Sequence, residues 1–350
     1  MRYEIVDGYG CQVLKHSERL VLRYPLAPPG ERGPGGEGKQ PKREVPVLHL
    51  DHLLIGTKGV TVSTDALALC CERGIPVTVV DWRGRPVGRF GSPALHGTAQ
   101  VRRAQIAAFA TEIGATFARE VVSGKLLNQA DNLRYIGKNR KTRAPNEHEA
   151  LTRTADTLQR LAKKAATVKG KNADDVRLPL MTVEAEGARA YWSVLSEVYG
   201  ERSGFAKREQ RGTRDPVNAA LNYAYGVLNG EVWNATILAG LEPYAGFLHV
   251  DRPGRLSFVL DLMEEFRPVV ADRVVFGLVA KGWKIGQEEN GWLDMPTKRR
   301  LIQAIGERWG ARVLHQARKL QLRSVLQLQA RDAARHFQGK AEYIAFRLRW

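Results

Sequence analysis

Cysteine is scarce in this 350-residue sequence, and long apolar runs are absent. The three cysteines, Cys11, Cys70 and Cys71, are odd in number, include an adjacent pair and form no CxxC motif. This pattern predicts neither a disulfide framework nor a cysteine-bound zinc ion, so we interpret all three as reduced, buried side chains. Because no run of about 18 apolar residues occurs, we expect no membrane-spanning helix. The first residues also lack the pattern of a secretory signal, and the expected location is the cytoplasm.

Acidic residues are few relative to basic ones. The sequence has 37 Asp and Glu against 54 Lys and Arg, which gives a formal net charge of +17. Such an excess predicts a polyanionic partner, most simply nucleic acid. A membrane surface is the alternative, but no basic amphipathic helix flanked by anchoring aromatic residues is present. More than half of the excess lies between Lys298 and Trp350, where 13 basic residues face 3 acidic ones.

Two kinds of periodicity divide the chain. Up to about residue 95, short β-type runs alternate with Gly, Asp and Pro, whereas beyond a linker at Ser92–Thr98 the apolar period becomes about 3.6 residues. The predicted fold class is therefore α+β, with a β-rich domain at residues 1–95 and a larger all-α domain at residues 96–350. A chain of this length is long enough for two domains.

Three loops stand out along the whole chain, and helices are expected throughout the second domain. The Gly- and Pro-rich stretch Pro28–Lys42 is expected to be a flexible loop, and Gly200–Asp215 a basic loop. Asp81–Pro86 is interpreted as a tight turn only, because its glycine fits neither a Walker nor a GxGxxG spacing. The predicted helices are Ala99–Val122, Gly124–Arg140, Glu147–Val168, Met181–Tyr199, Pro216–Ala239, Ser257–Val279, Thr297–Ala317 and Leu320–Gln338, with Lys169–Pro179 as a polar connector.

The segment from Gly246 to Pro268 concentrates the residues that could carry chemistry. His249 precedes a basic loop, and an apolar run then carries Asp261, Glu264 and Glu265. Residues three and four apart share one face of a helix, so these carboxylates would point the same way and repel one another unless a cation lies nearby. A solvated acidic face is the simpler interpretation, but it explains neither the apolar surroundings nor the flanking basic residues. We therefore expect a metal site.

A further carboxylate ligand is needed, because divalent ions that act on phosphates prefer oxygen-rich shells. Glu184 is the preferred candidate, since it lies on a helical stripe with Gly187 and Tyr191. Glu186 is the second candidate, although a surface ion pair would suffice for it. Spacing alone favours a capping or ion-pair role for Glu184.

Several segments together resemble one protein family over nearly the whole chain. These are Leu53–Leu69 with Gly74–Arg89, Gly124–Gln129 (GKLLNQ), Leu180–Trp192 (LMTVEAEGARAYW), Arg214–Tyr225 (RDPVNAALNYAY) and Gly246–Pro268. They resemble CRISPR-associated protein one, the integrase subunit of CRISPR spacer acquisition. The last two are the most specific matches. One departure is Ala185, followed by Glu186, where the family usually has a glycine.

The resemblance implies a fold, a site and a reaction. The fold is an N-terminal β-sandwich that forms a homodimer and a helical C-terminal domain that holds Mg²⁺ or Mn²⁺. The implied metal ligands are Glu184, His249 and Glu264, with Asp261 as a second acidic position close to the metal. The implied enzyme is a DNA endonuclease and integrase that joins the 3′-hydroxyls of a short double-stranded DNA to a CRISPR repeat. Its dimers are bridged by the small CRISPR-associated protein two.

Phosphate contacts are expected from four arginines. Arg252 and Arg267 flank the implied ligands, and Arg211 and Arg214 lie in the basic loop; each could clamp phosphates, or serve solubility and ion pairing instead. Asp261 could help to deprotonate the attacking hydroxyl. The seven tryptophans are assigned to the core. Two other functions stay open: a metal-dependent nuclease for structured DNA without integration, and a non-catalytic protein that bridges DNA.

Overall fold

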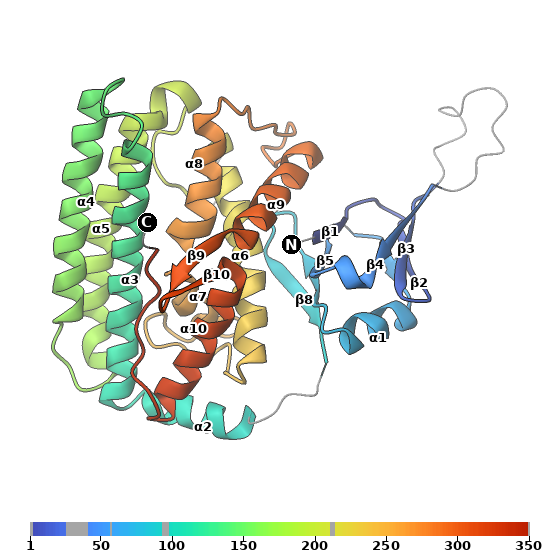
Figure 1. The fold of residues 1–350 in the computed structure, drawn as a ribbon, viewed down its shortest axis with the longest axis horizontal. Coiled ribbons are helices and arrows are strands. Elements are labelled where there is room, and N and C mark those ends of the chain that lie inside the picture. Colours follow the sequence, from blue (N-terminus) through green and yellow to red (C-terminus); the bar gives the residue numbers. More distant parts are fainter. Residues whose placement is uncertain (1–2, 26–40, 57, 93–97, 211–213, 349–350) are drawn as a thin grey trace.

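The N-terminal strands gather at one end of the molecule and most of the helices at the other (Figure 1). The computed structural model describes residues 3–25, 41–56, 58–92, 98–210 and 214–348. The predicted α+β order, with β-sheets before a larger helical region, is confirmed. Of the predicted loop Pro28–Lys42, only Pro41 and Lys42 lie within the described residues, and Lys42 begins a strand. Arg211 lies outside them.

The N-terminal part contains two four-stranded sheets, ordered β1-β5-β7-β8 and β4-β3-β2-β6. The first is parallel from β1 to β7, and β8 pairs with β7 in the antiparallel sense. Apolar side chains from both sheets, such as Val13, Leu22, Leu53 and Val77, form one buried cluster, as expected for a sandwich-like domain. The elements are β1 Tyr3–Val6, β2 Gln12–His16, β3 Arg19–Arg23, β4 Lys42–Pro46, β5 His52–Ile55, β6 Thr61–Val62, α1 Thr64–Glu72, β7 Val77–Val80 and β8 Pro86–Phe90.

The helical part forms a second, larger core. In Figure 1 its green helices α3, α4 and α5 lie together at the edge farthest from the sheets. The chain's last described residues run along α3, and Tyr343, Phe346 and Leu348 are buried there. The elements are α2 Thr98–Ala108, α3 Glu112–Gly137, α4 Pro145–Ala166, α5 Ala173–Ser203, α6 Pro216–Leu238, α7 Ser257–Met263, a π-helical stretch Arg267–Asp272, α8 Arg273–Ala280, α9 Met295–Gly310, β9 Arg312–His315, β10 Arg318–Gln321 and α10 Leu322–Phe337.

Several predicted helix boundaries need correction. The predicted helix Ala99–Val122 is divided between α2 and α3, because the Thr111 hydroxyl donates to the Ala108 carbonyl and ends α2. The second of these, α3, then continues without a break through most of the predicted helix Gly124–Arg140. The predicted helix Ser257–Val279 is divided into α7, the π-helical stretch and α8. The predicted connector Lys169–Pro179 is largely helical. The side chain of Asn172 accepts from a backbone amide of the first turn and caps α5, which continues through Pro179.

The helical domain is also not purely helical. The predicted helix Thr297–Ala317 ends at Gly310, and β9 and β10 form an antiparallel hairpin after it. The hairpin turn places Gln316 and Ala317 in the left-handed region, with φ of 46° and 63°. Such turns usually contain Asn or Gly, so the sequence lacks the signal that would reveal the hairpin.

A buried polar cluster connects the first sheet to the helices. The Glu231 carboxylate on α6 contacts His52 Nδ1 of β5 at 2.5 Å and accepts a 2.8 Å hydrogen bond from the Tyr3 hydroxyl of β1. His52 Nε2 lies 2.9 Å from Thr78 Oγ1 on β7. Arg323 of α10 lies 3.8 Å from the other carboxylate oxygen. Three strands are thereby linked to two helices through one carboxylate.

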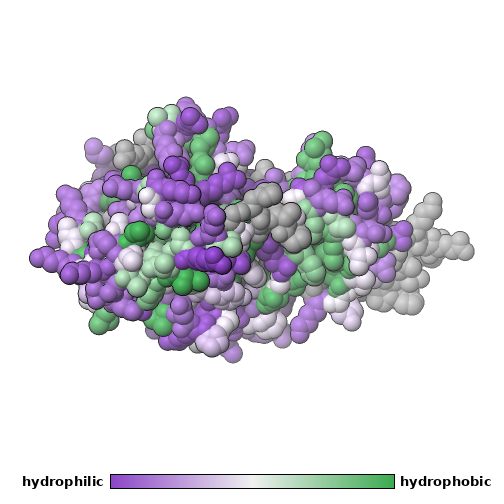
Figure 2. Space-filling view, turned by 90° about the horizontal axis from the view of Figure 1, so that it is seen from below, coloured by the Kyte–Doolittle hydropathy of each residue, from purple (hydrophilic) through white to green (hydrophobic). Residues whose placement is uncertain are grey.

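The surface agrees with the polar composition. Figure 2 shows hydrophilic residues over most of one face, interrupted by smaller hydrophobic areas on both parts of the molecule. Among the described residues, no helix is long and apolar enough to cross a membrane.

Candidate active site

A buried aspartate fixes the loop that carries His249. Asp261 of α7 is fully buried, and its Oδ2 accepts hydrogen bonds from the amides of Phe247 (2.6 Å) and Leu248 (3.0 Å). Its Oδ1 accepts from the His249 amide at 2.9 Å and lies 2.7 Å from His249 Nδ1. A Cβ on Gly246 would lie 2.9 Å from the His249 carbonyl oxygen, so this tight loop requires glycine. Asp261 therefore orients the imidazole, leaving Nε2 toward the cavity.

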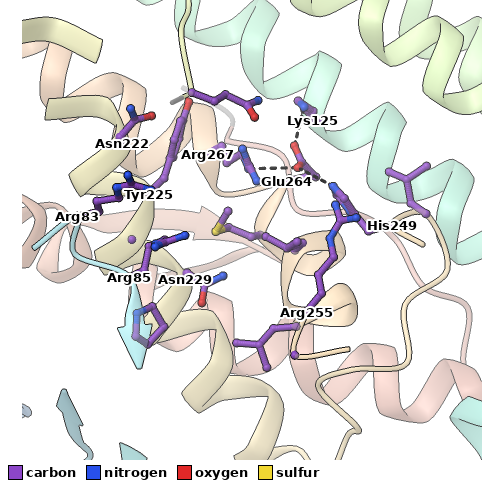
Figure 3. Close-up of a pocket in the computed structure, with 18 of the residues that line it drawn as sticks. Arg83, Arg85, Lys125, Asn222, Tyr225, Asn229, His249, Arg255, Glu264 and Arg267 are labelled. Atoms are coloured by element: carbon purple, nitrogen blue, oxygen red, sulfur yellow. Dashed lines mark ion pairs between the residues drawn. The ribbon is translucent and has the colours of Figure 1, made fainter. Parts of the chain in front are cut away.

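Glu264 lies one turn further, at the end of α7, where positive groups surround it. Its Oε1 is 3.1 Å from Arg267 Nε and 3.9 Å from His249 Nε2, and its Oε2 is 2.6 Å from Lys125 Nζ (Figure 3). Burial alone would raise the pKa of Glu264, but Arg267, Lys125 and His249 outweigh it and hold the pKa well below its usual value. The buried carboxylate is therefore ionised at neutral pH.

Glu184 reaches the same place from α5. Lys125 of α3 lies between Glu184 and Glu264 and pairs with both. Burial alone would lower the pKa of Lys125, but the two carboxylates raise it, so the ammonium stays charged. Glu186 points elsewhere, is about half exposed, and lies 3.8 Å from Lys164. Of the two glutamates considered from the sequence, only Glu184 faces the site.

One cavity of about 690 Å³ is lined by Glu184, His249 and Glu264. Two carboxylates and an imidazole form a donor set that suits a divalent cation. Within the described part of the chain, however, no group of three His, Cys, Asp or Glu side chains is close enough to hold a metal ion as it stands. The positive charge between the two carboxylates is supplied by Lys125.

The cavity wall is strongly basic. Arg83 and Arg85 enter it from the turn between β7 and β8, opposite Lys125 and His249 (Figure 3). The basic residues that line the cavity are Arg83, Arg85, Lys125, Arg208, Arg255 and Arg267. Sequence reasoning gave Asp81–Pro86 a turn role only and overlooked Lys125. The sequence feature that could have indicated a functional role for this turn was its content of one tryptophan and two arginines.

Close packing holds this turn against α6. A Cβ on Gly84, which has a φ of 75°, would lie 2.8 Å from the Tyr223 carbonyl oxygen. A Cβ on Gly226 would overlap the backbone of Gly84. Within the turn, Asp81 Oδ1 accepts from the amide of Arg85 at 3.0 Å, and Oδ2 accepts from its Nε at 3.0 Å. The N-terminal domain thus places its arginines in the cavity of the C-terminal domain.

An aromatic ring positions two of the cavity arginines. The Arg267 and Arg208 guanidinium carbons lie 4.9 Å and 5.3 Å from the centre of the Tyr225 ring. Arg208 also donates to Asn222 Oδ1 at 2.6 Å. The Tyr225 hydroxyl donates to Asp272, whose pKa burial raises to about 6. These contacts hold the arginines in place before any ligand binds.

The four arginines expected from the sequence differ in position. Arg267 lines the cavity. Arg252 is exposed and does not line it, whereas Arg255 does. Arg214 lines a second, smaller cavity, and Arg211 lies outside the described residues.

Glu265 does not join the other carboxylates, contrary to the expectation of one shared face. Its Oε2 accepts from the Phe346 amide at 2.6 Å and from Gln329 Nε2 at 3.0 Å, and the Tyr343 hydroxyl donates to Oε1. Burial raises its pKa to about 8, although these three donors oppose the shift. The backbone leaves α7 at this point, so adjacent glutamates diverge: Glu264 faces the cavity and Glu265 anchors the C-terminal segment.

Known proteins resemble this chain in sequence and in fold. Residues 5–307 match the family model described as "CRISPR associated protein Cas1". The chain is 34% identical to a CRISPR-associated endonuclease Cas1 of Archaeoglobus fulgidus over 99% of both chains. Its fold is similar to a casposase bound to integration product (TM-score 0.77, 19% identity, 98% of this chain and 92% of the other). It is also similar to a chain of a Cas6-RT-Cas1–Cas2 complex (TM-score 0.71, 18% identity, 99% and 36%).

Proposed function

The chain belongs to the Cas1 family of CRISPR-associated proteins, and from this premise we propose that it is a metal-dependent DNA endonuclease and integrase of CRISPR spacer acquisition. The observation that carries the proposal is the convergence of Glu184, His249 and Glu264 in one basic cavity. Two comparisons support the proposal further. A relative is named an endonuclease, and the chain shares its fold with a casposase bound to integration product.

The donor set fits Mg²⁺ or Mn²⁺. Glu184, His249 and Glu264 would hold the ion, because two of them already flank a positive charge and the imidazole is oriented toward the same space. A bound ion would polarise the scissile phosphate and offset the charge that develops on it.

The protein side chains hold the reacting DNA. Arg85, Arg255 and Arg267 bind phosphate oxygens through charge-assisted hydrogen bonds. Asp261 acts as a positioning residue for His249 rather than as a proton acceptor, because its oxygens already accept from three amides and contact the ring. In integration the attacking group would be a DNA 3′-hydroxyl, and the scissile P–O bond of the repeat would break as the new one forms. The hydroxyl proton would pass to solvent, and the displaced strand would take up a proton and leave with a free 3′-hydroxyl. Water replaces the hydroxyl in hydrolysis.

The remaining assignments follow from the family. We assign residues 1–95 to homodimerisation and residues 96–350 to catalysis and DNA binding, with the addition that Arg85 of the first part also contacts DNA. The partners are double-stranded DNA, as spacer precursor and repeat, and the small CRISPR-associated protein two (Cas2). A fold shared with part of a Cas1–Cas2 complex supports the latter. The proposed location is the cytoplasm.

Strand transfer with matched variants tests the proposal. A short duplex, a repeat substrate, Mn²⁺ and the small partner should give joined product with the unmodified chain. Glu184→Gln should reduce the product about a hundredfold or more, because a metal ligand supplies several kcal/mol of stabilisation. Glu186→Gln is the matched control, since that side chain lies two residues away and faces Lys164. DNA binding should survive in both.

Each competing function gives a different result. Cleavage of structured DNA without joined product would replace integration by a nuclease role. Unchanged product in both Glu184→Gln and His249→Ala would remove these residues from the site. DNA binding without any cleavage or joining, with or without Mn²⁺, would leave a non-catalytic bridging protein, which the net charge of +17 also accommodates.

A further inference from the structure

Lys125 of α3 joins the two carboxylates of the candidate active site. Its Nζ lies 2.6 Å from Glu264 Oε2 and donates to Glu184 Oε1. The lysine is 8% exposed, yet it lines the large cavity. A divalent ion that binds Glu184 and Glu264 together needs the same two oxygens. The ammonium group and the ion therefore compete for one position.

The charges around this position are balanced by protein side chains. Glu184 and Glu264 are paired with Lys125, and Arg267 Nε lies 3.1 Å from the other oxygen of Glu264. Like charges repel one another strongly where water is largely excluded. An ion added beside both Lys125 and Arg267 would place three cationic groups against two carboxylates. Binding of the ion therefore requires one of the two cationic side chains to move away.

Of these two side chains, Arg267 is the more firmly held. Its guanidinium carbon lies 4.9 Å from the centre of the Tyr225 ring, and its backbone begins the π-helical stretch. The Lys125 ammonium instead ends a flexible stem that borders the cavity. The backbone beside it is fixed, because a Cβ on Gly124 would lie 2.5 Å from the Ala345 Cβ. Lys125 can therefore turn into the cavity by side-chain rotation while α3 stays in place.

We propose that Lys125 is an exchangeable counter-ion, which holds Glu184 and Glu264 together until a divalent ion takes its place and then turns to a DNA phosphate in the cavity. The inference rests on the proposed function and adds to it a competitor for the metal inside the site. No covalent bond changes in the exchange, and the lysine keeps its proton. The cavity gains the charge of the ion, so binding of the ion and binding of DNA strengthen each other.

A permanent ion pair is the competing interpretation. Lys125 would then keep Glu184, and an ion would have to bind between Glu264 Oε1 and His249 Nε2, which lie 3.9 Å apart. Arg267 Nε already lies 3.1 Å from that same glutamate oxygen. An ion there would meet the guanidinium group directly, so the geometry favours exchange at Lys125.

Metal titration of matched lysine variants tests the exchange without catalysis. Calorimetry with Mn²⁺ and no DNA compares the unmodified chain with Lys125→Met, which keeps the approximate shape of the side chain and removes its charge. The variant should bind Mn²⁺ about tenfold or more tightly, because no ammonium group has to be displaced. A lysine that only supports the fold would give unchanged or weaker binding. Lys164→Met is the control, since Lys164 faces Glu186 at 3.8 Å on the surface and should leave the affinity unchanged.

Thermal unfolding covers the case in which Lys125→Met is unstable. Without Mn²⁺ the variant should melt below the unmodified chain, because Glu184 and Glu264 lose the cation between them, and saturating Mn²⁺ should remove this difference. A variant that stays unfolded or keeps its low melting temperature in Mn²⁺ would refute the exchange and leave the proposed function intact. Unchanged or weaker Mn²⁺ binding would do the same. Failure of the unmodified chain and both variants to bind Mn²⁺, with or without a DNA duplex, would refute the proposed metal dependence itself.

Discussion

Replacement of Glu231 by Gln should destabilise the junction between the two parts of the chain in a pH-dependent manner. Glu231 is buried beneath the first sheet, where it meets His52, the Tyr3 hydroxyl and Arg323. Glutamine preserves the size of the side chain but removes its charge. The measured change therefore reports on the ionised carboxylate rather than on packing.

The size of the effect follows from the shift in pKa. Burial alone would raise the pKa of Glu231, but His52, Arg323 and the Tyr3 hydrogen bond lower it from 4.5 to about 2. At 1.36 kcal/mol for each pKa unit, ionised Glu231 stabilises the folded state by about 3 kcal/mol. Because the folded pKa is the lower one, this contribution is complete above the unfolded value near 4.5. It is lost as the pH falls toward 2.

Urea denaturation of both proteins from pH 7 down to pH 3 measures the prediction. The variant should be less stable by about 3 kcal/mol at pH 7, and the difference should shrink below pH 4.5. Glu44→Gln is the control: its carboxylate forms exposed pairs on β4 and should contribute no more than about 1 kcal/mol.

Two results would contradict this reasoning. A difference below about 1 kcal/mol at pH 7 would mean that the carboxylate gains little from its partners. A difference that stays constant between pH 7 and pH 3 would mean that the variant acts through packing and not through charge.

Three further predictions concern the site. Gly226→Ala places a methyl group against the backbone of Gly84. The substitution should therefore lower the free energy of unfolding by about 1–3 kcal/mol, and it should reduce strand transfer because Arg85 shifts. A normal melting temperature with full activity would contradict this. Asp261→Asn should weaken Mn²⁺ binding, measured by calorimetry, about 10- to 100-fold, because His249 loses the carboxylate that orients its ring. Unchanged affinity would show that the His249 ring does not need this carboxylate. The DNA affinity should fall steeply as the salt concentration rises. For each phosphate neutralised, log K should fall by about 0.9 per unit of log salt concentration. A flat response would argue against phosphate contacts.

The sequence predicts the site where local features suffice. The order of strands and helices follows from apolar periodicity. His249 and Glu264 lie on one loop and the helix after it, so their proximity follows from a short stretch of chain. Glu184 could be preferred over Glu186 because a helical stripe separates the inward from the outward side of α5, and the structure places the two glutamates on those sides.

The sequence fails where a residue's environment is created by distant segments. Lys125 has the spacing of an ordinary helical lysine, and only the approach of α5 and α7 to α3 buries it between Glu184 and Glu264. The divergence of Glu264 and Glu265 has the same origin, since the C-terminal segment provides the donors that draw Glu265 away. A periodicity argument assigns both glutamates to one face because it contains no information about partners more than sixty residues away.

The turn between β7 and β8 is the clearest case of site residues that come from a distant segment. The change in apolar periodicity near residue 95 separates the β-rich part from the helical part. This boundary predicts that the whole site lies in the helical part. Yet Gly84 and Gly226 pack so closely that the turn and α6 behave as one surface, and Arg83, Arg85 and Trp82 come from the β-rich side of the boundary. Part of the cavity wall therefore belongs to the N-terminal part of the chain, although the sequence boundary separates that part from the other site residues.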